Sequence, residues 1–301
     1  MSYDVLVIGG GPAGLSAALN VRARGRSVLV VTNPPEENPL WRAERVDNYL
    51  GMGAVSGAQM LSDMRAQAEA AGVEFLTGRA LNASYMMDNW YVSVGSDMYN
   101  ARAVVLSGGV ARGKKFPGEQ EYLGRGVSYC ATCDGAFFRG KTVAVIGGGD
   151  VAVEDAIFLA RACEKVYLIH RRDSLRAAQS LQNTMLALPN VEVCCDSVVE
   201  SINGDGQVSS LTMLHKPSGE RRELPLQGVF IAVGIKPNSE SFISNIASDE
   251  KGYLIAGEDC ATSMPGVFAA GDIRTKKLRQ IVTAVADGAN AVEGVQEYFL
   301  Q

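Results

Sequence analysis

Two cysteines separated by two residues are the side chains in this sequence best suited to redox chemistry. They lie in the run Tyr129-Cys130-Ala131-Thr132-Cys133-Asp134-Gly135. At this spacing two thiols can close a small reducible disulfide, and their pKa values differ from that of an ordinary cysteine. Asp134 directly follows the second thiol, so its carboxyl group could move a proton when the dithiol forms or reacts. Its alternative role is to stabilise the turn before Gly135.

A zinc half-site and an inert structural pair are the alternatives for Cys130 and Cys133. A structural zinc site needs four ligands, so a second Cys-x-x-Cys or nearby histidines would have to complete it. The sequence offers neither; its remaining cysteines and its two histidines are Cys163, Cys194, Cys195, Cys260, His170 and His215. We therefore predict no metal site, and the pattern assigns no role to the other four cysteines.

Two glycine-rich turns are the second chemical signal, and each stands between a predicted strand and a predicted helix. The first, Gly9-Gly10-Gly11-Pro12-Ala13-Gly14, follows the strand 5–8, and the second, Gly147-Gly148-Gly149-Asp150-Val151-Ala152, follows the strand 143–146. Such glycines let the backbone approach a pyrophosphate, and the N-terminus of the helix faces the anion. One such run can be an ordinary loop. Two copies of strand, turn, helix and strand predict two dinucleotide-binding units.

The residues after the second strand of each unit distinguish the two nucleotides. The strand 165–169 is followed by His170-Arg171-Arg172 and then by Arg176. Guanidinium groups suit a 2′-phosphate and an acid would repel it, so this unit is predicted to bind NADPH rather than NADH. The alternative is a solvated basic loop. After the strand 27–31 no acid occurs before Glu36, a departure from the usual pattern that remains compatible with FAD.

The order of these units predicts two domains, the second inserted into the first. A β-rich stretch, 73–106, a buried strand that ends at Gly271-Asp272, and a helix over 280–300 complete the first unit. The fold class is therefore α/β, with two Rossmann-like, three-layer ββα domains. The first predicted domain comprises 1–112 and 238–301, and the predicted NADPH-binding domain with the cysteine pair comprises 113–237. The stretches 108–118 and 234–238 are predicted linkers.

The composition excludes several other classes of protein. The chain has 301 residues, 47% of them hydrophobic, and a formal net charge of −5. It has no basic excess for nucleic acid or for an anionic membrane surface. No apolar run approaches the ~18–20 residues that span a bilayer, and the N-terminus lacks the pattern of a signal peptide. We expect a cytoplasmic protein with neither a nucleic-acid nor a membrane partner.

Together these motifs resemble those of the low-molecular-weight thioredoxin reductases, which are FAD-dependent pyridine nucleotide–disulfide oxidoreductases. The resemblance covers nearly the whole chain and is most specific at Cys130–Gly135, at the second glycine turn, at the arginines, and at Gly271-Asp272 with Arg279-Gln280. It implies that the first glycine turn binds the FAD pyrophosphate and that Asp272 binds the ribityl chain. The residues implied to lie along the flavin are Asn48, Arg279, Gln280 and Ala284.

The resemblance also implies a relay and a homodimer. NADPH would reduce FAD, reduced FAD would reduce the Cys130–Cys133 disulfide, and the dithiol would reduce thioredoxin. The nicotinamide and the disulfide would share the inserted domain, so both must reach one flavin in turn. A rotation that hinges near Gly113 and at 234–238 would allow this.

Two segments depart from the family pattern and leave the electron donor open. Residues 36–46 lack the Gly-Gly-Gln stretch that many relatives carry, and residues 273–278 lack a frequent acid and tyrosine. Both would border the flavin ring, so ferredoxin is an alternative electron donor. Relatives that use ferredoxin lose the second glycine turn and the arginines, which this chain keeps. The same motifs are also compatible with a flavin-dependent dithiol oxidase or with a non-catalytic nucleotide-binding module.

Overall fold

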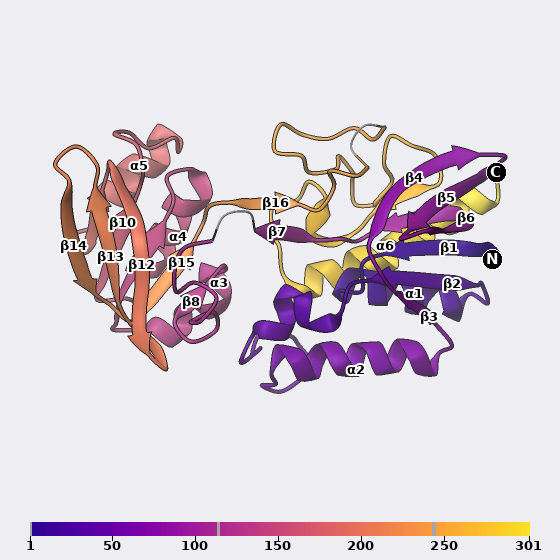
Figure 1. Cartoon of the computed structure of the whole chain (residues 1–301), viewed down its shortest axis with the longest axis horizontal. Coiled ribbons are helices and arrows are strands. Elements are labelled where there is room, and N and C mark those ends of the chain that lie inside the picture. Colours follow the sequence, from indigo (N-terminus) through magenta and orange to yellow (C-terminus); the bar gives the residue numbers. More distant parts are fainter. Residues whose placement is uncertain (1, 113–114, 243–244) are drawn as a thin grey trace. The chain divides into compact units, whose positions relative to one another are not determined.

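The chain forms two compact units. A computed structural model describes residues 2–112, 115–242 and 245–301. One unit comprises Met1–Ala111 and Lys236–Gln301, and the other comprises Arg112–Ile235 (Figure 1). The predicted domain boundaries lie within two residues of this division. The predicted hinge at Gly113 lies outside the described residues, and which cofactor each unit binds stays a prediction.

The first unit is built on a seven-stranded sheet in the order β3-β2-β1-β6-β5-β4, with β17 beside β6. The strands β1, β2, β3, β6 and β17 run parallel, and β6 continues into an antiparallel meander with β5 and β4. The bounds are β1 (Ser2–Ile8), β2 (Val28–Thr32), β3 (Glu74–Thr77), β4 (Ala80–Met86), β5 (Asn89–Val94), β6 (Asp97–Leu106) and β17 (Val267–Ala269). The helices are α1 (Pro12–Ala23), α2 (Gly57–Ala70) and α6 (Ile281–Phe299).

Alternate residues of the buried strand β1 face two different layers, because successive side chains of a strand point to opposite sides. Val5 and Val7 pack in one core cluster with residues of α1 and α6. Leu6 and Ile8 pack in a second cluster with the meander and with Phe242. Figure 1 shows α1 and α6 on one side of the parallel strands. The first unit is therefore a three-layer ββα structure.

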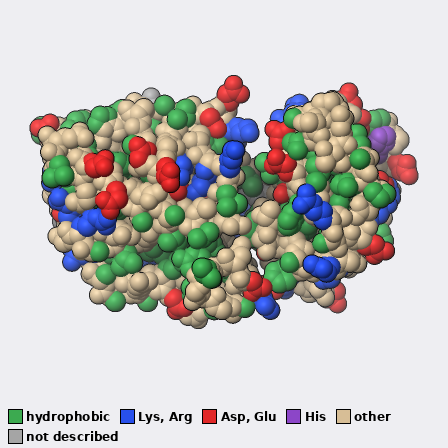
Figure 2. Space-filling model, turned by 180° about the vertical axis from the view of Figure 1, so that it is seen from behind, with side chains coloured by type: hydrophobic (Ala, Val, Ile, Leu, Met, Phe, Trp, Pro, Cys, Tyr) green, Lys and Arg blue, Asp and Glu red, His purple; other side chains and the backbone are tan. Residues whose placement is uncertain are grey.

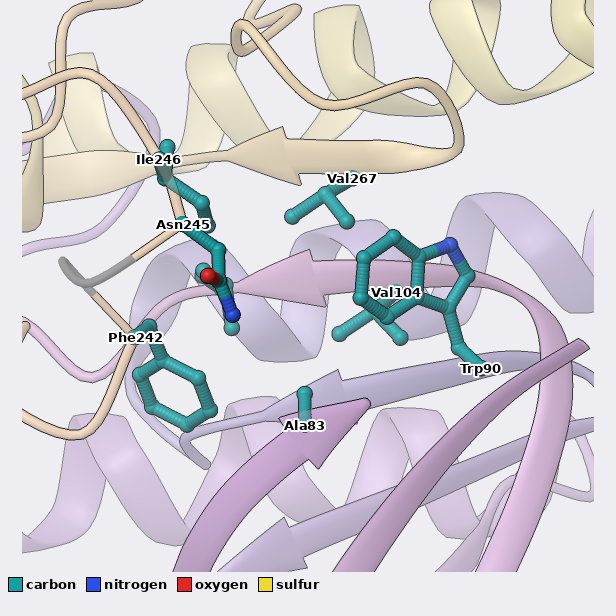
Figure 3. Close-up of a pocket in the computed structure, with 8 residues that line it drawn as sticks. Ala83, Trp90, Val104, Phe242, Asn245, Ile246 and Val267 are labelled. Atoms are coloured by element: carbon teal, nitrogen blue, oxygen red, sulfur yellow. The ribbon is translucent and has the colours of Figure 1, made fainter. Parts of the chain in front are cut away.

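A small apolar hollow lies in the second cluster, between the sheet and the segment around Phe242 (Figure 3). Its lining residues are Ala83, Trp90, Val104, Leu106, Phe242, Asn245, Ile246 and Val267. None of these carries a charge, and none is a predicted site residue. We assign the hollow to core packing.

The second unit repeats this plan on a smaller scale. Its five-stranded sheet has the order β11-β10-β9-β15-β8, with parallel pairing between neighbouring strands. The bounds are β8 (Val127–Ser128), β9 (Thr142–Ile146), β10 (Lys165–Ile169), β11 (Val191–Cys194) and β15 (Gly228–Ile231). The helices α3 (Ala131–Asp134), α4 (Asp150–Ala160) and α5 (Gln179–Leu186) accompany it. A three-stranded antiparallel sheet forms the third layer: β12 (Ser197–Asp205), β13 (Gln207–His215) and β14 (Glu220–Pro225).

The predicted α/β class is confirmed, with two corrections to local structure. Helix α4 begins at Asp150, directly after its glycine N-cap, Gly149, so residues 150–152 of the predicted second glycine turn are helical. Both predicted linkers contain a strand, β7 (Val110–Arg112) and β16 (Ile235–Pro237), and the two strands pair. Neither segment was expected to be a strand because the pairing depends on a partner more than a hundred residues away, which a local pattern does not show.

The distribution of charged side chains and the character of the helices bear on how the surface can interact. On the face drawn in Figure 2, acidic and basic side chains are interspersed rather than gathered into one basic surface. Within the described residues, no helix has both the length and the apolar character needed to span a bilayer.

Helices α1 and α6 approach each other so closely that only glycine fits at Gly288. A Cβ at this position would overlap the backbone oxygen of Ala13 and would lie 2.8 Å from the backbone nitrogen of Ala17. Close by, the Ser16 hydroxyl donates a hydrogen bond to the backbone oxygen of Val285 (2.7 Å). This contact fixes the start of α1 against α6.

Replacing Gly288 by alanine should destabilise the protein, because the added methyl group meets backbone atoms that cannot move independently. We expect a loss of about 1–3 kcal/mol in the free energy of unfolding, measured by urea titration. Gly53→Ala is the matched control, because apart from its chain neighbours no heavy atom in the described part of the chain lies within 4 Å of its Cβ position. Equal stabilities of the two variants would contradict the proposed close packing.

Candidate active site and dinucleotide-binding turns

Cys130 and Cys133 form a disulfide in the second unit, with their Cα atoms 5.2 Å apart. Cys130 is the N-cap of the short helix α3, and the backbone N–H of Cys133 donates to its Sγ (3.2 Å). The Thr132 Oγ1 lies 3.4 Å from the same sulfur. Both cysteines are half-buried.

Asp134 is held by a residue that the sequence analysis missed. The Ser128 hydroxyl donates to Asp134 Oδ2 (2.6 Å), and the backbone N–H of Cys130 donates to Ser128 Oγ (3.0 Å). Burial raises the pKa of the Asp134 carboxyl above its ordinary value, and the Ser128 hydrogen bond opposes this shift. A carboxyl group with a raised pKa beside a disulfide is suited to proton transfer. The only signal for Ser128 in the sequence is its position two residues before the motif.

The first glycine turn leaves the N-terminus of α1 bare. Gly9 has a φ of +118°, a conformation that L-residues rarely adopt. A Cβ on Gly14 would overlap the backbone oxygen of Gly9, so helix and strand pack closely. Gly11 is the N-cap, Pro12 begins the helix, and neither a side-chain cap nor an acid occupies the first turn. The free N–H groups of this turn fit an anion such as a pyrophosphate.

The structure brings three segments of the predicted FAD site together around Gly271. A Cβ on Gly271 would lie 2.9 Å from the Cβ of Ala13 and 3.7 Å from that of Ala284. The adjacent Asp272 has a buried Oδ1 without a hydrogen-bond partner among the described residues. Burial raises the pKa of Asp272, and the charges of Lys276 and Arg279 oppose the rise. A buried carboxyl oxygen without a partner fits a ligand hydroxyl group.

A buried cluster of charged residues contacts the turn at Gly271. Asp287 accepts hydrogen bonds from Arg274 Nε (2.9 Å) and Nη2 (2.7 Å), from Lys276 Nζ (2.7 Å) and from the backbone N–H of Gly271 (2.8 Å). Burial alone would raise the pKa of Asp287, but the hydrogen bonds from Arg274 and Lys276 outweigh it and hold the pKa below its ordinary value. The stretch 273–278, which departs from the family pattern, thus supplies the two cations of this cluster.

Three other residues of the predicted flavin site have different surroundings. The Arg279 guanidinium donates to the backbone oxygens of Asp272 (3.5 Å), Arg274 (3.2 Å) and Lys276 (3.1 Å). Gln280 is the N-cap of α6 and forms a capping box with Thr283. These two residues order the loop in which Asp272 lies. Asn48 is exposed, and the structure gives it no contact with the others.

The second glycine turn is open at its centre. Apart from its chain neighbours, no heavy atom of the described residues lies within 4 Å of a Cβ built on Gly149, the N-cap of α4. A Cβ on Gly147 would lie 2.5 Å from that of Ala152, so the strand and helix are in close contact. The Asp150 carboxylate accepts from the backbone N–H of Ala178 (2.8 Å), which fixes the following loop, and Val151 is exposed. This turn also leaves N–H groups that fit a phosphate.

The cation cluster beside the second turn divides into two kinds of residue. Arg171, Arg172 and Arg176 are exposed and form no ion pair within the described part of the chain. The backbone N–H of Arg176 donates to the oxygen of Gly148 (2.6 Å), so the loop is tied to the turn. His170, in contrast, is buried, and a Cβ on Gly148 would overlap its ring. Burial, together with the nearby arginines, lowers its pKa, so His170 supports the turn as a neutral ring.

Comparisons with known proteins agree on one family. The model of the family "Pyridine nucleotide-disulphide oxidoreductase" matches residues 3–288. The chain is 40% identical to the thioredoxin reductase of Listeria innocua over 298 residues, 98% of this chain and 93% of that protein. It is 40% identical to that of Bacillus subtilis over 299 residues, 98% of this chain and 94% of that protein. The crystal structure of thioredoxin reductase from Streptococcus pyogenes is similar, with a TM-score of 0.94, 38% identity, and coverage of 99% and 98%.

Asp287→Asn tests the ion cluster, because it keeps the shape of the side chain and removes the charge that two cations share. We expect a loss of about 3–5 kcal/mol in the free energy of unfolding at pH 7. The folded-state pKa of Asp287 is lowered, so its stabilisation is present above the unfolded value of about 3.9 and is lost as the pH falls through the folded value. The difference between wild type and variant should therefore shrink at acidic pH.

Urea titrations between pH 7 and pH 3 measure this difference. Asp63→Asn is the control, because Asp63 is an exposed acid of α2 that accepts a hydrogen bond from Gln59 (2.8 Å) and forms no ion pair among the described residues. It should change stability by less than about 0.5 kcal/mol throughout. A difference for Asp287→Asn that stays constant down to pH 3 would contradict the assigned ion pairs.

Proposed function

Since the chain belongs to the thioredoxin reductases of the pyridine nucleotide-disulphide oxidoreductase family, we propose that it reduces the disulfide of thioredoxin with electrons from NADPH. A bound FAD and the Cys130–Cys133 pair would carry the electrons. The observation that carries this proposal is the half-buried Cys130–Cys133 disulfide with the half-buried Asp134 carboxyl next to it. The homodimer and the cytoplasmic location expected from the sequence stay predictions.

The residues of the first unit fit FAD. The bare N-terminus of α1 would hold the pyrophosphate, and the unpartnered Oδ1 of Asp272 would accept a hydrogen bond from the ribityl chain. Ala13 and Ala284 both lie close to Gly271, so the three segments meet beside the N-terminus of α1. When bound, the flavin supplies the chemistry that links hydride transfer to disulfide reduction.

The residues of the second unit fit NADPH. The open turn at Gly149 would take its pyrophosphate, and the three unpaired arginines would take its 2′-phosphate. These features favour NADPH over ferredoxin as the donor, because a ferredoxin-dependent enzyme needs neither. They also count against a dithiol oxidase, which needs no nicotinamide, and against a non-catalytic module, which needs no cysteine pair.

The last step is thiol–disulfide exchange at Cys130 and Cys133. One thiolate of the reduced pair attacks the disulfide of thioredoxin, which forms a mixed disulfide and releases one thioredoxin sulfur as a thiolate. The second thiol of the pair, as a thiolate, then attacks the mixed disulfide, restores the Cys130–Cys133 bond and releases the other thioredoxin sulfur. Two protons are needed for the two released thiolates, and the Asp134 carboxyl can deliver one of them.

Anaerobic mixing experiments test the proposed relay. We expect NADPH to bleach the flavin absorbance quickly, and NADH and reduced ferredoxin to do so slowly, because only NADPH carries the 2′-phosphate that the arginines fit. Cys130→Ser and Cys133→Ser should keep this bleaching and lose thioredoxin reduction. Cys195→Ser, which removes a half-buried cysteine outside the pair, should keep both.

The outcomes separate the candidate activities. Bleaching by ferredoxin and not by NADPH would overturn the donor assignment. Peroxide formation in air at the rate of dithiol oxidation, without NADPH consumption, would indicate an oxidase. Thioredoxin reduction that survives both cysteine substitutions would overturn the role of the pair.

Ser128→Ala tests how Asp134 acts. The Ser128 hydrogen bond lowers the pKa of Asp134, so its removal should raise that pKa further. As a proton donor Asp134 works below its pKa, so the alkaline limb of the pH profile for thioredoxin reduction should move to higher pH. Asp134→Asn should abolish this limb and lower the rate about 100-fold.

Steady-state rates across pH 5–9 measure the effect. Ser209→Ala, at an exposed serine of β13, should leave the profile unchanged. An unchanged profile for Ser128→Ala would contradict the proposed coupling between these two residues.

A further inference from the structure

The segment after β2 departs from the family pattern, and the structure gives it a defined shape. Two short 3-10 helices, Pro35–Glu37 and Pro39–Arg42, follow one another there. Asn38 joins them, as the C-cap of the first and the N-cap of the second. Both caps fix its backbone, so its side chain has a defined direction.

Within the described residues, the Asn38 side chain forms a hydrogen bond through its Oδ1 and none through its Nδ2. Its Oδ1 accepts a hydrogen bond from the backbone N–H of Leu40 (2.9 Å), which fixes the orientation of the amide group. Its Nδ2 makes no hydrogen bond within the described residues. It lies 3.1 Å from a Cβ built on Gly11, and apart from the chain neighbours of Gly11 no other heavy atom of the described residues comes within 4 Å of that position. The free NH2 group therefore lies beside the N-cap of α1.

Hydrogen bonds on both sides of Asn38 hold its backbone in place. Its N–H donates to the oxygen of Pro35 (3.0 Å), and its oxygen accepts from the N–H of Trp41 (3.1 Å). Farther along, the backbone N–H of Gly57 donates to the oxygen of Ala43 (2.7 Å). Leu40 and Trp41 pack against the helix-side core cluster of the first unit. The position of the Asn38 amide is thus set before any ligand binds, which reduces the entropy cost of a contact.

The charges nearby do not compete for this amide. The carboxylate of the neighbouring Glu37 accepts from Asn33 Nδ2 (3.0 Å) rather than from Asn38. The first turn of α1 contains no acid, and its own N–H groups face the same region. The side-chain amide of Asn38 is therefore an additional hydrogen-bond donor beside the backbone N–H groups at the N-terminus of α1.

We infer that Asn38 donates a hydrogen bond from Nδ2 to the pyrophosphate of the dinucleotide bound at the first glycine turn. This inference rests on the proposed binding of FAD by the first unit. The contact makes Asn38 a cofactor-positioning residue in the segment where many relatives carry glycines. A hydrogen bond to a charged phosphate oxygen is stronger than one between neutral groups.

Asn38→Asp tests this directly, because it keeps Oδ1 for Leu40 and replaces the donor with a charged oxygen that repels phosphate. We expect the Kd for FAD to rise about 10- to 100-fold, measured through the fluorescence of released flavin on dilution of the holoenzyme. Asn82→Asp is the matched control: Asn82 is exposed in the same unit, and its Oδ1 accepts from Ser93 (2.7 Å). It adds the same charge and should leave the Kd unchanged.

ADP as a competitor identifies the group that Asn38 contacts. If the contact is with the pyrophosphate, Asn38→Asp should weaken ADP and FAD by similar factors. A loss confined to FAD would place the contact on the flavin and overturn the inference. Unchanged FAD affinity in Asn38→Asp would overturn it too, whereas a wild-type protein that binds no FAD would overturn the proposed function itself. Circular dichroism checks folding. Should Asn38→Asp not fold, Asn38→Ser, which keeps an acceptor for Leu40, should show the same direction of change.

Discussion

Close approach between backbone segments at glycine residues is the constraint on which the first unit depends. At Gly14 and Gly288 a single methyl group would overlap a backbone oxygen, so α1 is locked between its own strand and α6. The N-terminus of α1 can then stay bare, because packing rather than a side-chain cap fixes it. A helix end held in this way offers N–H groups to an anion without first having to reorganise.

The charges of the first unit are arranged around that constraint. Gly271 must lie against Ala13, and its N–H donates to Asp287, which lies in helix α6. A buried carboxylate is costly unless it is paired, and Arg274 and Lys276 provide the pairing. Within the described residues, the Oδ1 of the neighbouring Asp272 has no hydrogen-bond partner. One acid is thus satisfied within the protein, and the other is left for a ligand.

Local patterns predict the glycine turns, the strands beside them, the helix α6 and the redox motif, because each depends on neighbours within a few residues. They do not predict Ser128, Asp287 or Asn38. The contacts of Asp287 and Asn38 join segments that are separated in sequence. Asp287 is paired with Arg274 and Lys276, and the sequence gives no sign that these two side chains turn toward it. The pairing of β7 with β16 was missed for the same reason. His170 was grouped with the arginines by position, yet its ring is buried under Gly148, which only the packing reveals.

The chain has six cysteines, and burial of four of them explains why thiol–disulfide exchange can be confined to one pair. Burial raises the pKa of Cys163 and Cys195, and it raises that of Cys194 to about 11 and that of Cys260 to about 12. These four remain protonated thiols near neutral pH, and the thiolate is the form that attacks a disulfide. Cys130 and Cys133 are half-buried and already joined to each other, with Asp134 beside them. Disulfide exchange is therefore directed to this pair by the protonation of the others as much as by the motif itself.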